Sequence, residues 1–307
     1  MPITPAPIAA ACFALVSVGL WSFFGYFASR LSMLPSTLMV GVAMIIAGIA
    51  SLPTARSWRV PWRIHLLGVA GIGGNMLLFF TAFHFAPVVE VNLVNYIWPL
   101  LTVLLTPLFI AGSRLRVHHV VGALVGFAGA ALVVCNAESS GSGSSPVLGY
   151  AICATGAVLW SCYCLYTKRL AAFPSSAVGG FCLSSGILLL AAHACFAPVI
   201  EPLRGLSARD WQLLVLCGLG PMGLAYFTWD AAMKRGDPRV IGSLAFFTPL
   251  ISTLILAVVG GHRIGWPVLV ALALIVGGAV IGSLELFRSR SGVYEPPTTA
   301  SGLPPGP

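Results

Sequence analysis

The sequence predicts an all-α polytopic membrane protein whose ten transmembrane helices form two inverted five-helix repeats. Three observations lead to this fold class: the composition, a series of ten apolar segments, and a phrase that occurs twice. The chain has 307 residues, of which 58% are hydrophobic and only 8% charged, and its mean hydropathy is +0.96. Soluble domains carry charge on about a quarter of their residues. The composition therefore excludes a soluble globular protein.

The apolar segments are each long enough for a helix across a bilayer, which needs roughly 20 residues. They cover residues 8–28, 36–54, 64–85, 89–111, 118–136, 147–167, 176–198, 211–230, 240–260 and 266–286. The first segment has no Lys or Arg before Arg30. It lacks the basic region of a cleaved signal peptide, so we expect it to be retained as a helix.

The duplicated phrase is Leu20-Trp21-Ser22, which returns 139 positions later as Leu159-Trp160-Ser161. Later matches have a larger offset: Trp62, Gly71 and Gly74 pair with Trp211, Gly220 and Gly223 at 149 positions, and Pro99 with Pro249 at 150. Five segments, an odd number, separate the copies, so the second copy must be inverted in the membrane. Inverted repeats are typical of secondary transporters.

The same repeat divides the chain into domains. We expect an N-terminal repeat at residues 1–137, a Ser/Gly linker at 138–146, a C-terminal repeat at 147–288 and a disordered cytoplasmic tail at 289–307. The linker has no apolar periodicity, and the tail is too rich in Pro, Gly, Ser and Thr to bury a core.

The distribution of positive charge predicts cytoplasmic N- and C-termini, because Lys and Arg near span ends are retained inside. This orientation leaves only Arg30, Arg204, Arg209 and Arg263 outside, out of 16 Lys and Arg residues. The twelve inside are Arg56, Arg59, Arg63, Arg114, Arg116, Lys168, Arg169, Lys234, Arg235, Arg239, Arg288 and Arg290. The bias explains the net charge of +8, so no nucleic-acid partner is expected.

Glycine patterns in the fifth and tenth segments predict close helix packing. Gly122, Gly126 and Ala130 recur at intervals of four, and Gly278 and Gly282 do the same. Small residues at this spacing let helix backbones approach closely. These helices are expected either to support the periphery of the fold or to form the face of a homodimer.

No metal site, cofactor or catalytic motif is expected. The eight cysteines fall almost entirely within apolar spans, where they act as small hydrophobic residues. Cys162 and Cys164 point about 200° apart on a helix and cannot share a metal. The chain shows neither a Gly-rich phosphate loop with Lys, as ATP-driven transport requires, nor a zinc-helix motif or nucleophile elbow.

Polar residues in the fourth segment predict a wet cavity. On a helix Asn92, Asn95, Tyr96 and Pro99 share one face,. A proline within a helix removes a backbone hydrogen bond and kinks it. Pro249 occupies the matching position of the second half, and paired broken helices indicate a binding site near the membrane midplane.

Aromatic faces on other segments extend this predicted site. Asn75, Phe79 and Phe83 share a face of the third segment, Trp160 and Tyr163 of the sixth, and Tyr226 and Trp229 of the eighth. The full predicted substrate-binding set is Trp21, Asn75, Phe79, Phe83, Asn92, Asn95, Tyr96, Pro99, Trp160, Tyr163, Tyr226, Trp229, Phe246 and Pro249. Tyr and Trp also populate membrane interfaces, which is the alternative role for such residues.

Three ionisable residues have two interpretations each. Glu90 near the external end of the fourth segment either favours the dipole of that helix or meets a substrate ammonium or a proton,. Asp230 either has a functional role or forms a structural ion pair with Lys234, which it precedes by four residues, the spacing of a helical ion pair,. His84 either senses pH or is a structural histidine,.

Two parts of the chain resemble the aromatic amino acid exporters of the drug/metabolite transporter superfamily. The first runs from Glu90-Val91-Asn92 through Asn95-Tyr96-Ile97-Trp98-Pro99, and the second comprises Gly242-Ser243 and Phe247-Thr248-Pro249. The resemblance covers nearly the whole chain. It implies ten spans as two inverted halves, a bacterial inner-membrane location, and export of aromatic and other mostly neutral amino acids without a cofactor.

The expected mechanism is secondary transport by alternating access, with the halves rocking about the two proline kinks. Proton exchange and uniport both remain open. The alternatives are export of other amphipathic metabolites or cationic drugs on the same fold, and an intramembrane enzyme. A sugar nucleotide is disfavoured because its phosphates would need basic residues inside the membrane, and every Lys and Arg here falls near a loop.

Overall fold

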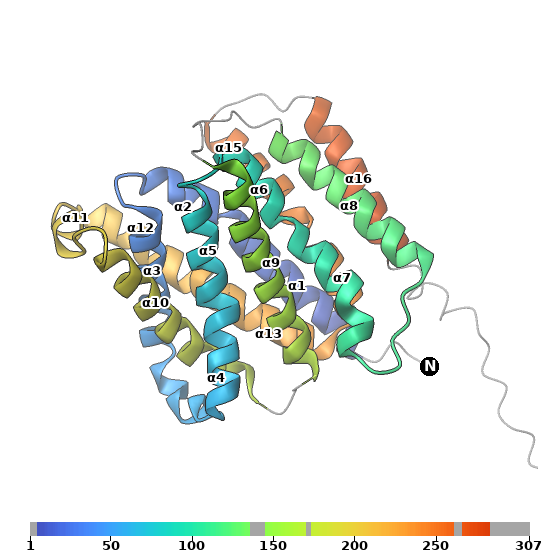
Figure 1. The fold of residues 1–307 in the computed structure, drawn as a ribbon, viewed down its shortest axis with the longest axis horizontal. Coiled ribbons are helices and arrows are strands. Elements are labelled where there is room, and N and C mark those ends of the chain that lie inside the picture. Colours follow the sequence, from blue (N-terminus) through green and yellow to red (C-terminus); the bar gives the residue numbers. More distant parts are fainter. Residues whose placement is uncertain (1–4, 136–144, 170–172, 261–265, 283–307) are drawn as a thin grey trace, which may run out of the picture.

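The computed structural model describes residues 5–135, 145–169, 173–260 and 266–282, and all regular elements within these ranges are helical (Figure 1). The all-α prediction is therefore confirmed. The first half contains α1 (Pro5–Ser22), α2 (Phe24–Arg30), α3 (Ser36–Ala50), η1 (Leu52–Trp58), α4 (Trp62–Val69), η2 (Ala70–Gly74), α5 (Asn75–Ala82), α6 (Val88–Asn95), α7 (Ile97–Phe109) and α8 (Val117–Cys135). The second contains α9 (Pro146–Arg169), η3 (Ser175–Ala177), α10 (Val178–Ala194), α11 (Ile200–Arg204), α12 (Ala208–Leu219), η4 (Gly220–Leu224), α13 (Ala225–Arg235), α14 (Pro238–Leu244), α15 (Phe247–Gly260) and α16 (Trp266–Gly282).

Seven helices in the described ranges are long and apolar enough to cross a membrane, and an eighth is added if α3 and η1 count as one bent span. Two shorter apolar helices, Val117–Leu132 and Leu269–Gly282, coincide with the fifth and tenth predicted segments. All ten predicted segments are thus helical in their described parts, but length and composition alone identify only seven or eight of them as spans.

Some predicted boundaries differ from the structure. The second segment was expected to reach residue 54, but α3 ends at Ala50 and the chain bends by 86° into η1, whose first turn contains Pro53. Proline cannot continue the helical hydrogen bonding of the preceding turn. Most of the expected linker, the end of the tenth segment and the expected tail at 289–307 lie outside the described residues.

The spans that meet at the centre of the molecule are interrupted. The chain breaks at Phe23 between α1 and α2, at Tyr96 between α6 and α7, and between α14 and α15. The last two breaks lie just before Pro99 and Pro249, each of which lacks the N–H that would continue the preceding turn. A break in the helical pattern therefore precedes each of the two prolines at which a kink was expected.

A second pair of irregularities follows the repeat. The π-helical turns η2 and η4 begin at residues 70 and 220, which are 150 positions apart. Such turns inside α-helices are frequent at functional sites. The two halves thus share these turns as well as their kinks.

The duplicated phrase has a structural role at these kinks. The hydroxyl of Ser22 donates to the carbonyl of Thr248 at 3.2 Å, and that of Ser161 donates to the carbonyl of Trp98 at 2.9 Å. Each acceptor is the residue immediately before a kink proline. Each serine therefore joins the first span of its own half to the kinked span of the other half.

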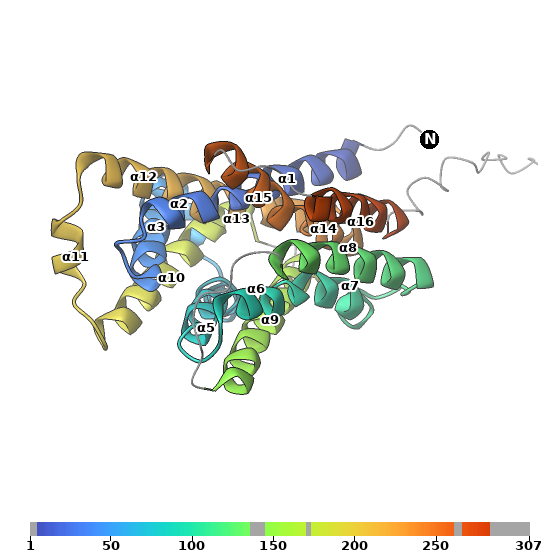
Figure 2. The ribbon, with the colours of Figure 1, turned by 90° about the horizontal axis from the view of Figure 1, so that it is seen from above.

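The glycine-rich helices form a tight pair at one end of the molecule, where Figures 1 and 2 show α8 alongside α16. A Cβ atom on Gly278 would lie 2.5 Å from the backbone nitrogen of Gly126, and one on Gly122 would lie 2.5 Å from that of Gly282. These faces are occupied within one chain. The glycine positions thus serve as the expected peripheral supports, and a homodimer would have to use the outer faces of these helices.

Candidate functional site

A cavity of about 350 Å³ lies between the interrupted helices of the two halves. We call it the central cavity. Its lining residues are Trp21, Phe24, Gly25, Ala28, Ser36, Asn75, Met76, Phe79, Phe80, Phe83, Asn92, Asn95, Tyr96, Trp98, Trp160, Met222, Tyr226 and Thr248. They come from both halves, and no Lys, Arg, Asp or Glu is among them. The lining is predominantly aromatic with a few neutral polar groups.

Indole and phenol rings close one end of the central cavity. The ring of Trp21 lies 6.0 Å from that of Trp160, 5.6 Å from that of Tyr226 and 5.2 Å from that of Trp229. Trp98 completes the group, at 5.9 Å from Trp160 and 5.4 Å from Trp229. Most of these contacts are edge to face, the arrangement that aromatic quadrupoles favour. The five rings form a packed floor.

A second aromatic group forms a wall above this floor. Phe79, Phe80 and Phe83 on α5 and its C-terminal end have ring centroids 4.8 to 6.1 Å apart. The π-helical turn η2 directly precedes α5. Since a π-turn inserts an extra residue into the helical ladder, it sets which side chains of α5 turn toward the cavity.

Amides supply the polar groups. Asn75 is 5% exposed, and its Oδ1 is buried without a hydrogen-bond partner. The Nδ2 of Asn92 donates to the carbonyl of Val88 at 2.9 Å, within its own helix. A buried amide oxygen without a partner costs free energy. Asn75 is therefore the lining residue that gains most from a ligand with a hydrogen-bond donor.

The predicted site residues fall into two groups. Nine of them line the central cavity: Trp21, Asn75, Phe79, Phe83, Asn92, Asn95, Tyr96, Trp160 and Tyr226. The remaining five are not part of the lining: Pro99, Tyr163, Trp229, Phe246 and Pro249. Pro99 and Pro249 lie buried at the kinks, and Phe246 packs against Gly126 and Phe127 of α8.

Tyr163 lies next to the floor, and Trp229 belongs to the floor, but neither residue lines the cavity. The ring of Tyr163 is 5.5 Å from that of Trp160, and the indole of Trp229 donates to Cys164 Sγ at 3.2 Å. Both side chains are buried.

Several lining residues were missing from the predicted set, namely Phe24, Gly25, Ala28, Ser36, Met76, Phe80, Trp98, Met222 and Thr248. Phe24, Gly25 and Ala28 belong to α2, which starts only after the break at Phe23. The repeat could have identified two of these residues from the sequence. Phe24 and Ala28 stand 139 positions before Tyr163 and Thr167, and Tyr163 was itself a predicted site residue.

The ionisable residues of interest lie outside the cavity lining. Glu90 is exposed in the first turn of α6, and His84 is exposed with its Nδ1 3.3 Å from the carbonyl of Thr81. The expected ion pair is present, since Lys234 Nζ lies 2.7 Å from Asp230 Oδ2.

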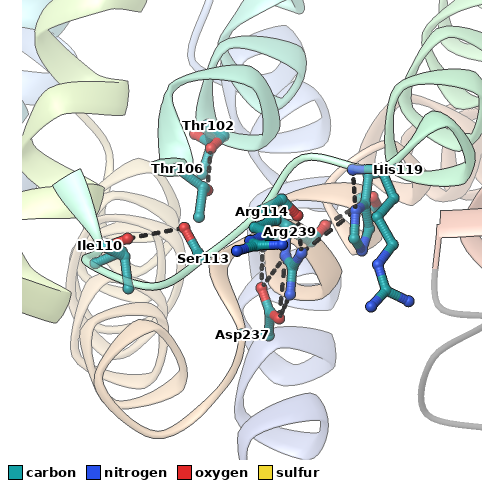
Figure 3. Close-up of polar contacts among 10 residues, drawn as sticks. Thr102, Thr106, Ile110, Ser113, Arg114, His119, Asp237 and Arg239 are labelled. Carbon is teal, nitrogen blue, oxygen red and sulfur yellow. Dashed lines mark hydrogen bonds and ion pairs between the residues drawn. The ribbon is translucent and has the colours of Figure 1, made fainter. Parts of the chain in front are cut away.

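A network of charged and polar groups joins the α7–α8 loop to the start of α14 (Figure 3). The guanidinium of Arg239 pairs with Asp237 at 2.6 Å and donates to the carbonyl of Arg114 at 2.8 Å. It also lies 3.3 Å from His119 Nδ1. Burial opposes ionisation of Asp237, but the hydrogen bonds and charge of Arg239 outweigh it and hold the pKa of Asp237 below its ordinary value.

Comparison with known families gives a match in both halves. The model of the EamA-like transporter family matches residues 8–135 and again residues 147–284. The same family description thus fits each half of the chain separately.

Individual relatives agree with this match. The chain is 37% identical to the aromatic amino acid exporter YddG of Ancylobacter novellus, over 88% of this chain and 95% of that protein. It is 24% identical to the protein of the same name from Escherichia coli, over 65% of this chain and 68% of the relative. A solved crystal structure with 36% identity superposes with a TM-score of 0.81, covering 90% of this chain and 98% of the other.

Proposed function

The chain belongs to the EamA-like transporter family, and from this premise we propose that it exports aromatic and other mostly neutral amino acids through the central cavity. The family and the exporter relatives make the protein a transporter and not an enzyme. The observation that carries the choice of substrate is the lining itself, which is aromatic, amide-bearing and free of charged residues.

The size and chemistry of the central cavity suit such a cargo. A volume of about 350 Å³ lies within the range of roughly 300–1,000 Å³ of small-molecule sites. Aromatic walls bind a planar ring by edge-to-face and stacked contacts. The absence of basic lining residues disfavours a nucleotide or a phosphate ester. Other amphipathic metabolites and cationic drugs are the alternative cargo, since aromatic faces also bind cations.

The interrupted helices offer groups for the charged end of an amino acid. Trp98 and Thr248 line the cavity from the first turns of α7 and α15. Helix N-termini carry partial positive charge, and transporters use those of broken helices to bind substrate carboxylates. The amide of Asn75 would then take the ammonium group. In this arrangement neither the carboxylate nor the ammonium of the substrate needs a charged side chain as its partner.

We further propose that the ten helical segments are ten spans in two inverted halves, with both termini in the cytoplasm of a bacterial inner membrane. The Lys and Arg distribution supports this orientation. It places Ala28, Ser36, Phe83 and Asn92 toward the external side, so the central cavity faces outward. The Arg239 network and the aromatic floor would then close it from the cytoplasm.

The deciding experiment is counterflow in proteoliposomes containing the purified protein. We expect labelled tryptophan and phenylalanine, and more weakly threonine, to exchange across the membrane, while a sugar nucleotide does not. Absence of aromatic amino acid flux would overturn the proposed function. The same liposomes, with and without a pH gradient, separate uniport from proton exchange, and size-exclusion chromatography with light scattering tests for a dimer.

A further inference from the structure

Three buried polar atoms lie beyond the aromatic floor, on the side away from the central cavity. The hydroxyl of Tyr163, the hydroxyl of Thr167 and Oδ1 of Asp230 have no partner in full hydrogen-bond geometry. The Tyr163 and Thr167 hydroxyls interact weakly with each other, and the Ser175 side chain lies beside the Asp230 carboxyl. The residues of the three atoms are only 3%, 2% and 1% exposed. Trp229, next to Asp230, donates to Cys164, next to Tyr163, at 3.2 Å, so these groups lie in one neighbourhood. Together with Lys234 we call Tyr163, Thr167 and Asp230 the inner cluster.

Such a group needs an explanation, because a buried polar atom without a partner costs free energy. Unsatisfied atoms of this kind are rare in native proteins and often have a functional role. Here three occur together, on α9 and α13.

The repeat relates the inner cluster to the central cavity. At the offset of 139, the lining residues Phe24 and Ala28 correspond to Tyr163 and Thr167. At the offset of 150 between the starts of the two π-turns, the lining residue Phe80 corresponds to Asp230, and at the offset of 149 between the glycines of these turns it corresponds to the neighbouring Trp229. With the turn starts as the reference, Tyr163, Thr167 and Asp230 occupy, in the second half, positions that line the cavity in the first half.

From this correspondence we propose that the inner cluster is the substrate site of the cytoplasm-facing state, and that Asp230 binds the primary ammonium of the substrate there. This proposal rests on the proposed function and on the inverted arrangement of the halves. In inverted-repeat transporters one half rocks against the other, and the proposal takes each half to adopt, in the other state, the arrangement that its counterpart has here. The residues that line the open cavity in one half then have closed, packed counterparts in the other.

The contacts of Asp230 leave one carboxylate oxygen for a second cation. Its Oδ2 accepts from Lys234 Nζ at 2.7 Å, whereas Oδ1 has no partner in full hydrogen-bond geometry and the Ser175 side chain lies beside the carboxyl. Lys234 is itself held in place, because its Nζ also donates to the carbonyl of Phe173 at 2.8 Å and lies 3.7 Å from the centre of that ring. A carboxylate can accept several hydrogen bonds, so a substrate ammonium can bind Oδ1 without displacing Lys234.

The two sites differ in a way that suits export. Three polar residues of the inner cluster stand where the first half has apolar lining residues: Tyr163 corresponds to Phe24, Thr167 to Ala28 and, with the π-turn starts as the reference, Asp230 to Phe80. A charge-assisted hydrogen bond to the ammonium is therefore available on the cytoplasmic side and missing on the external side. The substrate would be bound more tightly where it is collected than where it is released.

The test compares substrate affinity at the two faces of the membrane. Tryptophan uptake into inside-out vesicles reports the KM at the cytoplasmic face, and uptake into right-side-out vesicles reports the KM at the external face. We expect Asp230→Asn to raise the cytoplasmic KM about tenfold or more and to leave the external KM unchanged. Asp210→Asn is the matched control, because it removes an acid from the other end of the same span.

Competition identifies the group that Asp230 binds. Tryptamine keeps the ammonium of tryptophan and lacks the carboxylate, whereas indole-3-propionate lacks the ammonium. In inside-out vesicles, Asp230→Asn should weaken inhibition by tryptamine and leave inhibition by indole-3-propionate unchanged. Equal weakening of both inhibitors would contradict the proposal.

Two milder variants keep the proposal testable if Asp230→Asn fails to fold. Tyr163→Phe and Thr167→Val each remove a hydroxyl that has no partner in full hydrogen-bond geometry, so we expect equal or higher melting temperatures. Both should nevertheless raise the cytoplasmic KM severalfold. A higher melting temperature with unchanged KM at both faces would overturn the inner-cluster site, whereas absence of tryptophan transport by the unmodified protein would overturn the proposed function instead.

Discussion

The central cavity and the inner cluster are built from corresponding positions of the two halves, yet one is an open aromatic chamber and the other a packed polar core. Nine aromatic residues line the cavity, while buried Asp230, Tyr163 and Thr167 lie on the opposite side of the floor. The two halves thus share their helix breaks and π-turns, which we call the frame, but differ in the residues between them. In the proposed mechanism the frame provides for the motion, and the divergence provides for chemical differences between the two faces.

Trp160→Ala should have the largest effect, because this ring belongs to the floor between the two regions and contacts Trp21, Trp98, Tyr163 and Tyr226. Truncating a buried Trp costs about 3–5 kcal/mol. We expect a lower melting temperature in detergent and a selective loss of tryptophan over threonine in counterflow. Phe83→Ala, at the cavity wall, is the control for ring loss away from the floor. Equal losses for tryptophan and threonine would remove Trp160 from the substrate site.

Asn75→Leu tests whether the neutral amide supports binding in the central cavity. The variant removes a buried oxygen without a partner, so the fold should not be destabilised, but the substrate loses a hydrogen bond worth about 0.5–3 kcal/mol. We expect a fall of roughly tenfold in kcat/KM for tryptophan in right-side-out vesicles. Met76→Leu, a neighbouring lining residue of similar volume, is the control and should stay within twofold. A wild-type KM for Asn75→Leu would exclude this amide from the site.

Arg239→Gln tests what keeps the inner cluster closed. The substitution breaks the bonds to Asp237 and to the Arg114 carbonyl, and a change of one or two kcal/mol shifts a two-state equilibrium about 5- to 30-fold. Cys164 is fully buried beside Trp229. In a variant that retains only this cysteine, we expect faster maleimide labelling of Cys164 from the cytoplasmic side.

Arg114→Ala is a close control for this experiment, because Arg114 contributes its backbone carbonyl to Arg239 and the substitution preserves that acceptor. Its labelling rate should match that of the parent. If both variants label equally, the Arg239 network does not hold the two halves together.

The pH dependence of Asp237 should give the smallest effect. Its pKa is lowered in the folded protein, so its contribution to stability is complete above the unfolded pKa of about 3.9 and is lost as the pH falls through the folded value. The melting temperature of the parent should exceed that of Asp237→Asn by a few degrees at pH 6, and the gap should close toward pH 3. A gap that widens on acidification would show that the ion pair with Arg239 does not stabilise the fold.

The sequence predicted the frame of this molecule better than its cavity. Hydropathy located the long helices but not the short helix α11, and the proline pair Pro99 and Pro249 located both breaks, because these patterns depend only on residue type and spacing. Helix faces drawn with a constant period failed where the helix is interrupted. The break at Tyr96 separates Pro99 from the face of Asn92, and the break at Phe23 turns Phe24 and Ala28 into the cavity.

The split of the predicted aromatic set has a different origin. Tyr163 and Trp229 share helix faces with lining residues, as expected, but their rings pack within or next to the floor and do not reach the cavity. Position along the membrane normal decides which aromatic residues reach the cavity in a given state, and helical periodicity contains no information about that depth.

The serines of the duplicated phrase each bind the interrupted span of the opposite half. Ser22 donates a hydrogen bond to the carbonyl before Pro249, and Ser161 donates one to the carbonyl before Pro99. Both bonds are made in the same conformation, so they stabilise the same state of the molecule. Removing either hydroxyl should lower the population of this state, and removing both should lower it further. Two oxygen atoms, one from each half, thus act together on one conformational balance.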